Sequence, residues 1–167
     1  MRGEGVRGQF EELLKKIVEA CHDLYGDRLV SLAVFGSVGR GTFRPDSDVD
    51  LLIVADPLPK GRRRRVEEFQ VIEETLEPVF GRLRSLGMHP VLSPIFKTKE
   101  EVRQGSLRFL DMSEDARILY DRDGFFATFL KGFRERLDRL GARRVWRGDV
   151  WYWELKPDYR PGEVFEL

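Results

Sequence analysis

Two acidic residues open a strongly apolar segment in the first third of the chain. Asp48 and Asp50 flank a valine, and residues 51–54 are Leu, Leu, Ile and Val. Because side chains alternate between the two faces of a sheet, an unbroken apolar run predicts a strand that is buried on both faces. The chain is therefore expected to fold around a sheet that has this strand in its centre and is covered on both sides.

The two acids at the start of this strand predict a metal site. Positions i and i+2 of a strand project to the same face, so the side chains of Asp48 and Asp50 should lie side by side. Neighbouring carboxylates repel each other unless a divalent cation lies between or beside them, and burying them without a partner is costly. Ligand sets made only of oxygen select Mg²⁺ or Mn²⁺ over softer metals. Asp48 and Asp50 are therefore the candidate metal ligands and catalytic residues.

A Gly-rich segment precedes the acids and follows another predicted strand, residues 29–35. Gly36 ends that strand, where the missing Cβ lets a backbone or a phosphate approach closely. Ser37 is predicted at the N-cap of a short helix whose free N–H groups form an anion site, and Arg40 adds a cation one turn later. An anion site and a dicarboxylate metal site on adjacent strands suit a nucleoside triphosphate carried with magnesium.

Three other interpretations of the acidic segment compete with this one. An EF-hand loop that begins at Asp46 needs Gly at its sixth position and Glu at its twelfth, where this chain has Leu51 and Pro57. A nucleotide-sugar glycosyltransferase also places an Asp-x-Asp pair on a metal, but it needs a nucleotide-binding βα domain ahead of the motif, and fewer than 50 residues precede it here. The third interpretation is a Gly-rich turn that binds no ligand. It does not explain why two acids open a buried strand, where carboxylates without a partner are energetically costly.

The rest of the chain alternates helices and strands. Periodic apolar positions predict helices over residues 9–25, 62–86 and 125–140, with Pro78 bending or splitting the second, and a short helix from Lys99. Strands are predicted over 29–35, 48–55, 88–96 and 117–120, and a hairpin over 143–156 with its turn at 147–149. The expected fold class is α+β, a small mixed sheet flanked by helices. We divide it into a core, residues 1–96, and a C-terminal α/β extension, residues 97–167, packed on the core as one compact unit.

The composition excludes several classes of protein. The 167 residues carry 29 Lys and Arg against 29 Asp and Glu, which argues against a generally basic nucleic-acid coat protein and against an acidic tail protein. The single cysteine, Cys21, excludes an intrachain disulfide, and with two histidines no His/Cys zinc site can form. Residues 1–10 lack the apolar core of a signal peptide, and no apolar run approaches the ~20 residues of a membrane span. We expect a soluble, cytoplasmic protein with no membrane partner.

The motifs resemble the signature of a known superfamily. Gly36-Ser37, ten residues, and then Asp48-Val49-Asp50 are similar to the signature of the DNA polymerase β-like nucleotidyltransferases. Arg40-Gly41 and the run from Pro45 to Asp48 resemble its small prokaryotic branch, the minimal nucleotidyltransferases. The strong match covers residues 29–55, about a sixth of the chain.

The resemblance implies a Mg²⁺-dependent enzyme that transfers a nucleoside monophosphate from an NTP, with ATP the expected nucleotide, to a hydroxyl and releases pyrophosphate. It assigns Gly36 and Ser37 to the β- and γ-phosphates and Asp48 and Asp50 to two Mg²⁺ or Mn²⁺ ions. The remaining residues expected at the nucleotide are Arg40, Gly41 and Arg44. The acceptor is a protein, a small molecule or RNA, and in the minimal branch acceptors include a tyrosine of a partner toxin. The chain itself can also form an oligomer.

One part of the family pattern is missing from this chain. The family usually carries a third carboxylate on a later strand, and the corresponding stretch, residues 89–96, has Ser93 at that place. The acids that could replace it are Glu100, Glu101 and Asp111. The missing acid motivates a second hypothesis, a catalytically impaired module that binds a nucleotide or a partner protein as an antitoxin does.

Two further features have a structural interpretation. The basic run Arg62–Arg65 is interpreted as a solvated helix start balanced by nearby glutamates, and an RNA contact is the alternative. The aromatic residues of the tail are interpreted as a small subcore under the hairpin, with a dimer surface or base stacking as alternatives. These aromatic residues are Trp146, Trp151, Tyr152, Trp153 and Tyr159.

Overall fold

A four-stranded mixed sheet forms the centre of the computed structural model, which describes residues 2–167 and their side chains from residue 5 onward. The strands are β1 (Leu29–Phe35), β2 (Val49–Ala55), β3 (Leu92–Lys97) and β4 (Arg117–Asp121), in the order β3-β2-β1-β4. β1 is antiparallel to both β2 and β4, whereas β2 and β3 are parallel. The predicted mixed sheet is confirmed, and β2 is one of its two interior strands.

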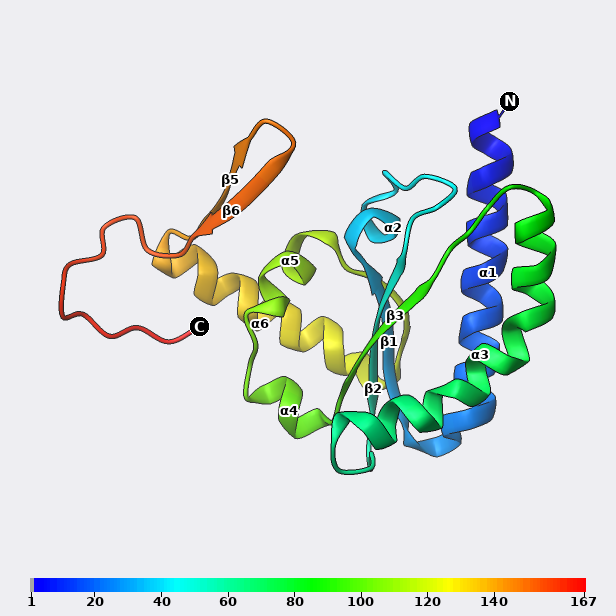
Figure 1. Cartoon of the computed structure of the whole chain (residues 1–167). Helices are drawn as coiled ribbons and strands as arrows, with labels where there is room; N and C mark the ends of the chain where they lie inside the picture. Colours follow the sequence, from blue (N-terminus) through cyan, green and yellow to red (C-terminus); the bar gives the residue numbers. More distant parts are fainter. Residues whose placement is uncertain (1) are drawn as a thin grey trace.

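Helices cover both faces of this sheet (Figure 1). α1 (Arg2–Tyr25) and α3 (Arg62–Ser85) lie on one face, and α4 (Lys99–Arg103), α5 (Arg108–Asp115) and α6 (Phe125–Leu140) lie on the other. The side chains of β2 divide between the two layers: Leu51 and Ile53 join the core under α1 and α3, and Leu52 and Val54 join the core under α5 and α6. All four are completely buried, as the apolar run predicted.

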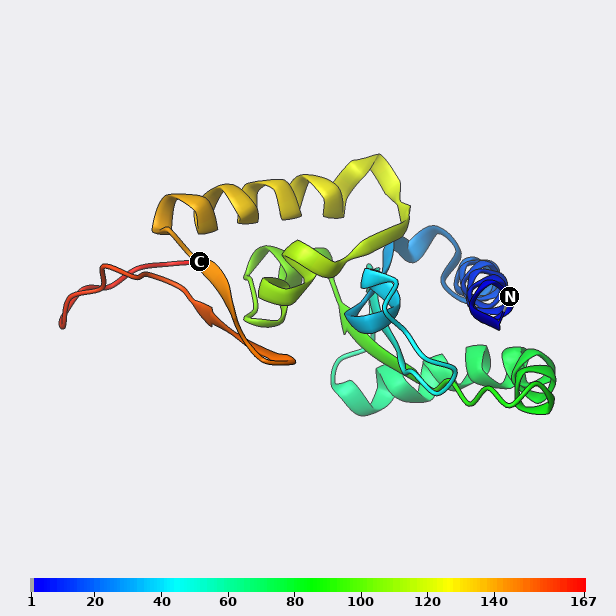
Figure 2. The ribbon, with the colours of Figure 1, turned by 90° about the horizontal axis from the view of Figure 1, so that it is seen from above.

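Most predicted elements are present, with shifted ends. Pro78 lies inside α3, and Figures 1 and 2 show that this helix changes direction without being split. β3 begins later than predicted because the residues before it form loop contacts, such as the bond from the His89 N–H to the Pro45 carbonyl at 3.0 Å. α5 follows the predicted helix at Lys99 after a short break and was not among the predicted elements. The remaining elements are the short helix α2 (Gly36–Arg40) and the 3-10 turns η1 (Gly26–Arg28) and η2 (Arg122–Gly124).

The C-terminal segment contributes to the central sheet and also forms a separate hairpin. β4 pairs with β1, so the segment after β3 supplies one strand of the sheet whose other three strands come from residues 1–97. The hairpin consists of β5 (Arg143–Arg147) and β6 (Val150–Glu154), as predicted, and it projects on the side of α5 and α6 (Figure 2). None of the helices in the described part of the chain is long and apolar enough to cross a bilayer.

Candidate active site

Asp48 and Asp50 lie at the start of β2, beside the end of β1. Asp50 pairs in register with Phe35 of β1 and with Ser93 of β3, and it is half-buried, whereas Asp48 is exposed. Burial and the negative charge of Asp48 raise the pKa of Asp50 above its usual value. The two carboxylates therefore form the concentrated negative charge that the sequence predicted.

Positive charges and one hydroxyl oppose this effect only in part. The Ser93 hydroxyl and the more distant charges of Arg40 and Arg108 act to lower the pKa of Asp50, but the net shift is upward. The pair thus offers oxygen donors and an excess of negative charge, which is the chemistry that a hard divalent cation needs. Asp48 and Asp50 fit Mg²⁺ or Mn²⁺ as ligands on this ground.

Gly36 brings the end of β1 directly against Asp50. Its φ is 64°, in the left-handed region, and a Cβ at this position would lie 2.3 Å from Oδ2 of Asp50. Glycine is therefore required both for the backbone conformation and for the approach of the carboxylate. Gly39 is required as well, because a Cβ there would lie 2.3 Å from the carbonyl oxygen of Asp115. The second requirement could not be predicted from the sequence, because Asp115 is 76 positions further along the chain.

Ser37 lies in the first turn of α2 and not at its N-cap. The helix begins at Gly36, so Phe35 occupies the N-cap position, two residues before the predicted N-cap at Ser37. The Ser37 carbonyl accepts the Thr42 N–H at 2.9 Å, and Gly41, with φ 73°, ends the helix in the left-handed conformation. The structure thus gives Gly41 a helix-capping role, and the contacts of Ser37 and Gly41 with a nucleotide stay predictions.

Arg40 is held by the C-terminal half of the chain. Its Nη1 donates to Oδ2 of Asp115 at 2.7 Å, and the Asp115 side chain is only 3% exposed. Arg144 of β5 donates to the other oxygen of Asp115 at 3.0 Å, and both guanidinium groups lie 4.9 Å from the ring centroid of Trp151. Arg40 therefore anchors α2 to α5 and to the hairpin, a role that the sequence analysis missed and that competes with the predicted phosphate contact.

Arg44 lies in the exposed loop between α2 and β2. Its backbone N–H donates to Oγ of Ser47 at 2.8 Å, which stabilises the turn ahead of the acids. Its side chain remains a predicted phosphate contact.

The structure places none of the candidate third acids beside the Asp48–Asp50 pair. Glu101 lies beyond the far end of β3, where both of its carboxylate oxygens accept N–H groups of Arg65 at 2.8 and 2.9 Å. That contact lowers the pKa of Glu101, and Glu100 is exposed on the same short helix. Over the described side chains, no group of three His, Cys, Asp or Glu could hold a metal ion.

The Asp111 carboxylate binds side chains of the hairpin. Its Oδ1 accepts the indole N–H groups of Trp151 and Trp153, each at 2.9 Å. The predicted subcore is thus partly present, because these two rings are half-buried while Trp146 and Tyr152 are exposed. Ser93 alone occupies the place beside Asp50 where the family pattern expects an acid.

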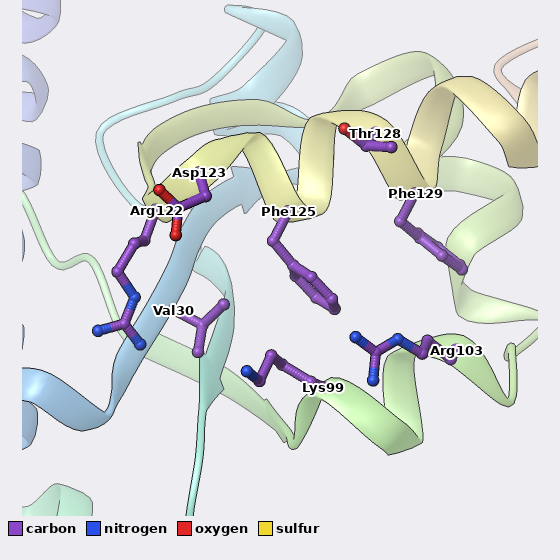
Figure 3. Close-up of a pocket in the computed structure, with 8 residues that line it drawn as sticks. All are labelled: Val30, Lys99, Arg103, Arg122, Asp123, Phe125, Thr128 and Phe129. Atoms are coloured by element: carbon purple, nitrogen blue, oxygen red, sulfur yellow. The ribbon is translucent and has the colours of Figure 1, made fainter.

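A cavity of about 430 Å³ lies away from this site (Figure 3). Its lining includes Val30 near the start of β1, Lys99 and Arg103 of α4, and Phe125 and Phe129 of α6. Asp50 pairs with Phe35 at the opposite end of β1, so this cavity is not part of the Asp48–Asp50 site.

Comparison with protein families matches residues 14–119 to the nucleotidyltransferase domain. The matched range is more than half of the chain and includes Gly36, Ser37, Asp48 and Asp50. This chain belongs to the nucleotidyltransferase family. The resemblance found in the sequence motifs is confirmed, and the chain is a member of a family of enzymes.

Named relatives of this nucleotidyltransferase occur in Methanocaldococcus jannaschii. The protein named "Putative protein adenylyltransferase MJ1305" is 31% identical over 130 residues, which cover 77% of this chain and 83% of the relative. A second protein of the same name, numbered MJ0604, is 39% identical over 46 residues, which cover 28% of this chain and 46% of the relative.

The solved structures to which this nucleotidyltransferase is similar include a toxin–antitoxin with AMP-PNP. That chain has a TM-score of 0.49 at 16% identity, and the match covers 77% of this chain and 92% of that one. They also include a complex of a tri-AMPylated HEPN toxin with an MNT antitoxin from Shewanella oneidensis. That chain has a TM-score of 0.45 at 14% identity, and the match covers 77% of this chain and 89% of that one.

Proposed function

We propose that this nucleotidyltransferase moves an adenylyl group from ATP to a hydroxyl of a partner protein, with Mg²⁺ or Mn²⁺, and releases pyrophosphate. The observation that carries the proposal is the Asp48–Asp50 pair at the start of β2, against which Gly36 packs without a side chain. The names of the two relatives, both protein adenylyltransferases, support ATP as donor and a protein as acceptor.

Each residue of the site has its own role in such a transfer. Asp48 and Asp50 hold the divalent ion, which when bound lowers the pKa of the attacking hydroxyl and offsets the charge of the triphosphate. Gly36 leaves room for a phosphate at the end of β1, and the Ser37 hydroxyl, in the first turn of α2, can donate to it. Ser93 stands beside Asp50 and orients its carboxylate.

A transfer assay tests the proposal. The protein is incubated with α-labelled ATP, Mg²⁺ or Mn²⁺ and a cell extract. The amount of label in each protein band is then measured. We expect Asp48→Asn and Asp50→Asn each to reduce the labelling by about 100-fold or more, because a metal ligand is lost. Asp46→Asn is the matched control, since Asp46 is an exposed acid of the same loop and lies outside the proposed ligand set.

A second function has one observation in its favour. Ser93 occupies the place of the third acid, which is the pattern expected of a module that binds a nucleotide or a partner but no longer catalyses transfer. Calorimetric binding of Mg-ATP without any labelled product would select this alternative. Labelled product that disappears in Asp50→Asn would exclude it, and absence of both binding and labelling would contradict the site itself.

The partner toxin implied by the sequence resemblance is one specific form of the proposed acceptor. A gene for a small helical protein next to the gene for this chain would support it. Labelling confined to proteins encoded elsewhere would argue against it.

A further inference from the structure

A polar groove of about 450 Å³ follows β3 away from the Asp48–Asp50 pair. Its floor is the strand itself, from Ser93 to Lys97. Its walls come from the start of α3, from α4, from the segment that follows α4 and from the first residue of α5. The wall residues are Gly61, Arg62, Arg65, Glu101, Ser106 and Arg108.

The charge of this groove is strongly positive. Arg65 and Glu101 neutralise each other through their two-point contact. The other three charged lining residues, Arg62, Lys97 and Arg108, form no ion pair within the part of the chain that the structure describes. The whole chain has a formal net charge of zero, so the excess of cations is a local property of the groove.

The groove adjoins the candidate active site through one residue. Ser93 lines the groove and is the register partner of Asp50. A chain segment lying in the groove would therefore bring a group at its end next to the Asp48–Asp50 pair.

The free edge of β3 is unsuited to binding a peptide as an added strand. Nη1 of Arg65 donates to the Phe96 carbonyl at 3.3 Å, so that carbonyl faces the free edge and is already occupied. Backbone groups two residues apart face the same edge, so Pro94 faces it too and has no N–H to donate. Recognition in this groove must come from the charged side chains.

The lining also argues against a nucleic-acid ligand. Proteins that bind single strands stack the bases on exposed aromatic side chains. Phe96 is the aromatic residue among those that line the groove, and it is buried. Cations without such a stacking surface fit the carboxylates of a protein segment better.

We propose that the groove along β3 binds the acceptor protein through an acidic segment adjacent to the hydroxyl that receives the adenylyl group. Arg62 and Lys97 bind carboxylates of that segment. Arg108 binds the carboxylate that lies nearest to Asp50. The proposal rests on the proposed function and adds the chemistry by which the acceptor is selected.

Binding and transfer to synthetic peptides test the inference with the full-length protein. The probes are fluorescent peptides with one tyrosine, one serine and one threonine, flanked by glutamates in one set and by lysines in the other, and a single-stranded RNA of similar length. Anisotropy with Mg²⁺ and a non-hydrolysable ATP analogue measures binding, and α-labelled ATP measures transfer. We expect the glutamate set to bind at least about tenfold more tightly than the lysine set, with a preference that weakens as salt is added.

Charge reversal locates the binding surface. Arg62→Glu and Lys97→Glu should each weaken binding of the glutamate peptides by about fivefold or more. The matched control is Arg64→Glu, since Arg64 is an exposed arginine of the same run that does not line the groove, and it should leave binding unchanged. Circular dichroism of each variant confirms that it is folded.

The outcomes separate this inference from the proposed function. Equal binding of both peptide sets, preference for the RNA, or equal effects of Arg62→Glu and Arg64→Glu would overturn the acidic-segment proposal, even if protein adenylylation is found in extracts. Selective binding of the glutamate peptides without transfer to any acceptor would support the groove and contradict the proposed activity alone.

Discussion

Among single residues, Gly36 and Asp50 constrain each other most closely. The Gly36→Ala substitution introduces a Cβ where Oδ2 of Asp50 lies 2.3 Å away, in a backbone conformation that disfavours any side chain. We expect a loss of about 1–2 kcal/mol in the free energy of unfolding and a much larger relative loss of Mg-ATP binding, because the carboxylate must move. Urea denaturation and calorimetry measure the two effects.

Gly132→Ala is the control for this substitution. Gly132 lies inside α6 with nothing within 4 Å of an added Cβ, so alanine should stabilise the helix by roughly 0.5–1 kcal/mol and leave nucleotide binding unchanged. If Gly36→Ala bound Mg-ATP as the wild type does, Gly36 would have no special role at the site.

The charged Asp50 carboxylate should lower the stability of the metal-free protein at neutral pH. Burial and Asp48 raise the pKa of Asp50, and an acid whose pKa is raised by folding opposes folding once the pH exceeds its usual value of 3.8. In buffer with a chelator, Asp50→Asn should therefore raise the melting temperature by a few degrees at pH 7. The gain should shrink as the pH falls through the raised pKa of Asp50 and should be absent below pH 3.8. A lower melting temperature for Asp50→Asn would mean that the carboxylate has an unseen stabilising partner.

At the scale of elements, the hairpin is attached to α5 by two indole groups. Trp151→Phe/Trp153→Phe keeps most of the apolar surface and removes both N–H donors to Asp111. We expect a loss of about 1–2 kcal/mol in the free energy of unfolding, measured in urea, because a half-buried carboxylate loses two hydrogen bonds. Trp146→Phe is the control, since Trp146 is 54% exposed, and an equal loss in that variant would show that the contacts with Asp111 contribute nothing.

For the molecule as a whole, we expect the stability to depend only weakly on the metal and the activity to require it. Two apolar clusters, one on each face of the sheet, hold the fold together, and the Asp48–Asp50 pair lies at the edge of both. Removing divalent ions with EDTA should abolish labelling from ATP, leave the far-ultraviolet circular dichroism spectrum unchanged and shift the melting temperature by less than about 3 °C. Added Mg²⁺ should restore labelling, whereas a large fall in melting temperature would point to a structural ion instead.

The central strand, the pair of acids at its start and the family could be predicted from the sequence because each depends on local order. An apolar run predicts two-sided burial of its strand, and the alternation of side chains places Asp48 and Asp50 on one face without any knowledge of the fold. The helix over residues 62–86 and the C-terminal hairpin were predicted for the same reason, since their periodic positions lie within one segment.

The partners of the charged residues were decided only by the tertiary structure. Arg40, Glu101 and Asp111 were candidates for the site, yet each is paired with a residue at least 33 positions away along the chain: Asp115, Arg65 and Arg144. The need for glycine at position 39 and the basic groove along β3 also arise from segments that only the folded chain brings together. The charge and type of a residue are fixed by the sequence, but which opposite charge neutralises it depends on distances that only folding sets.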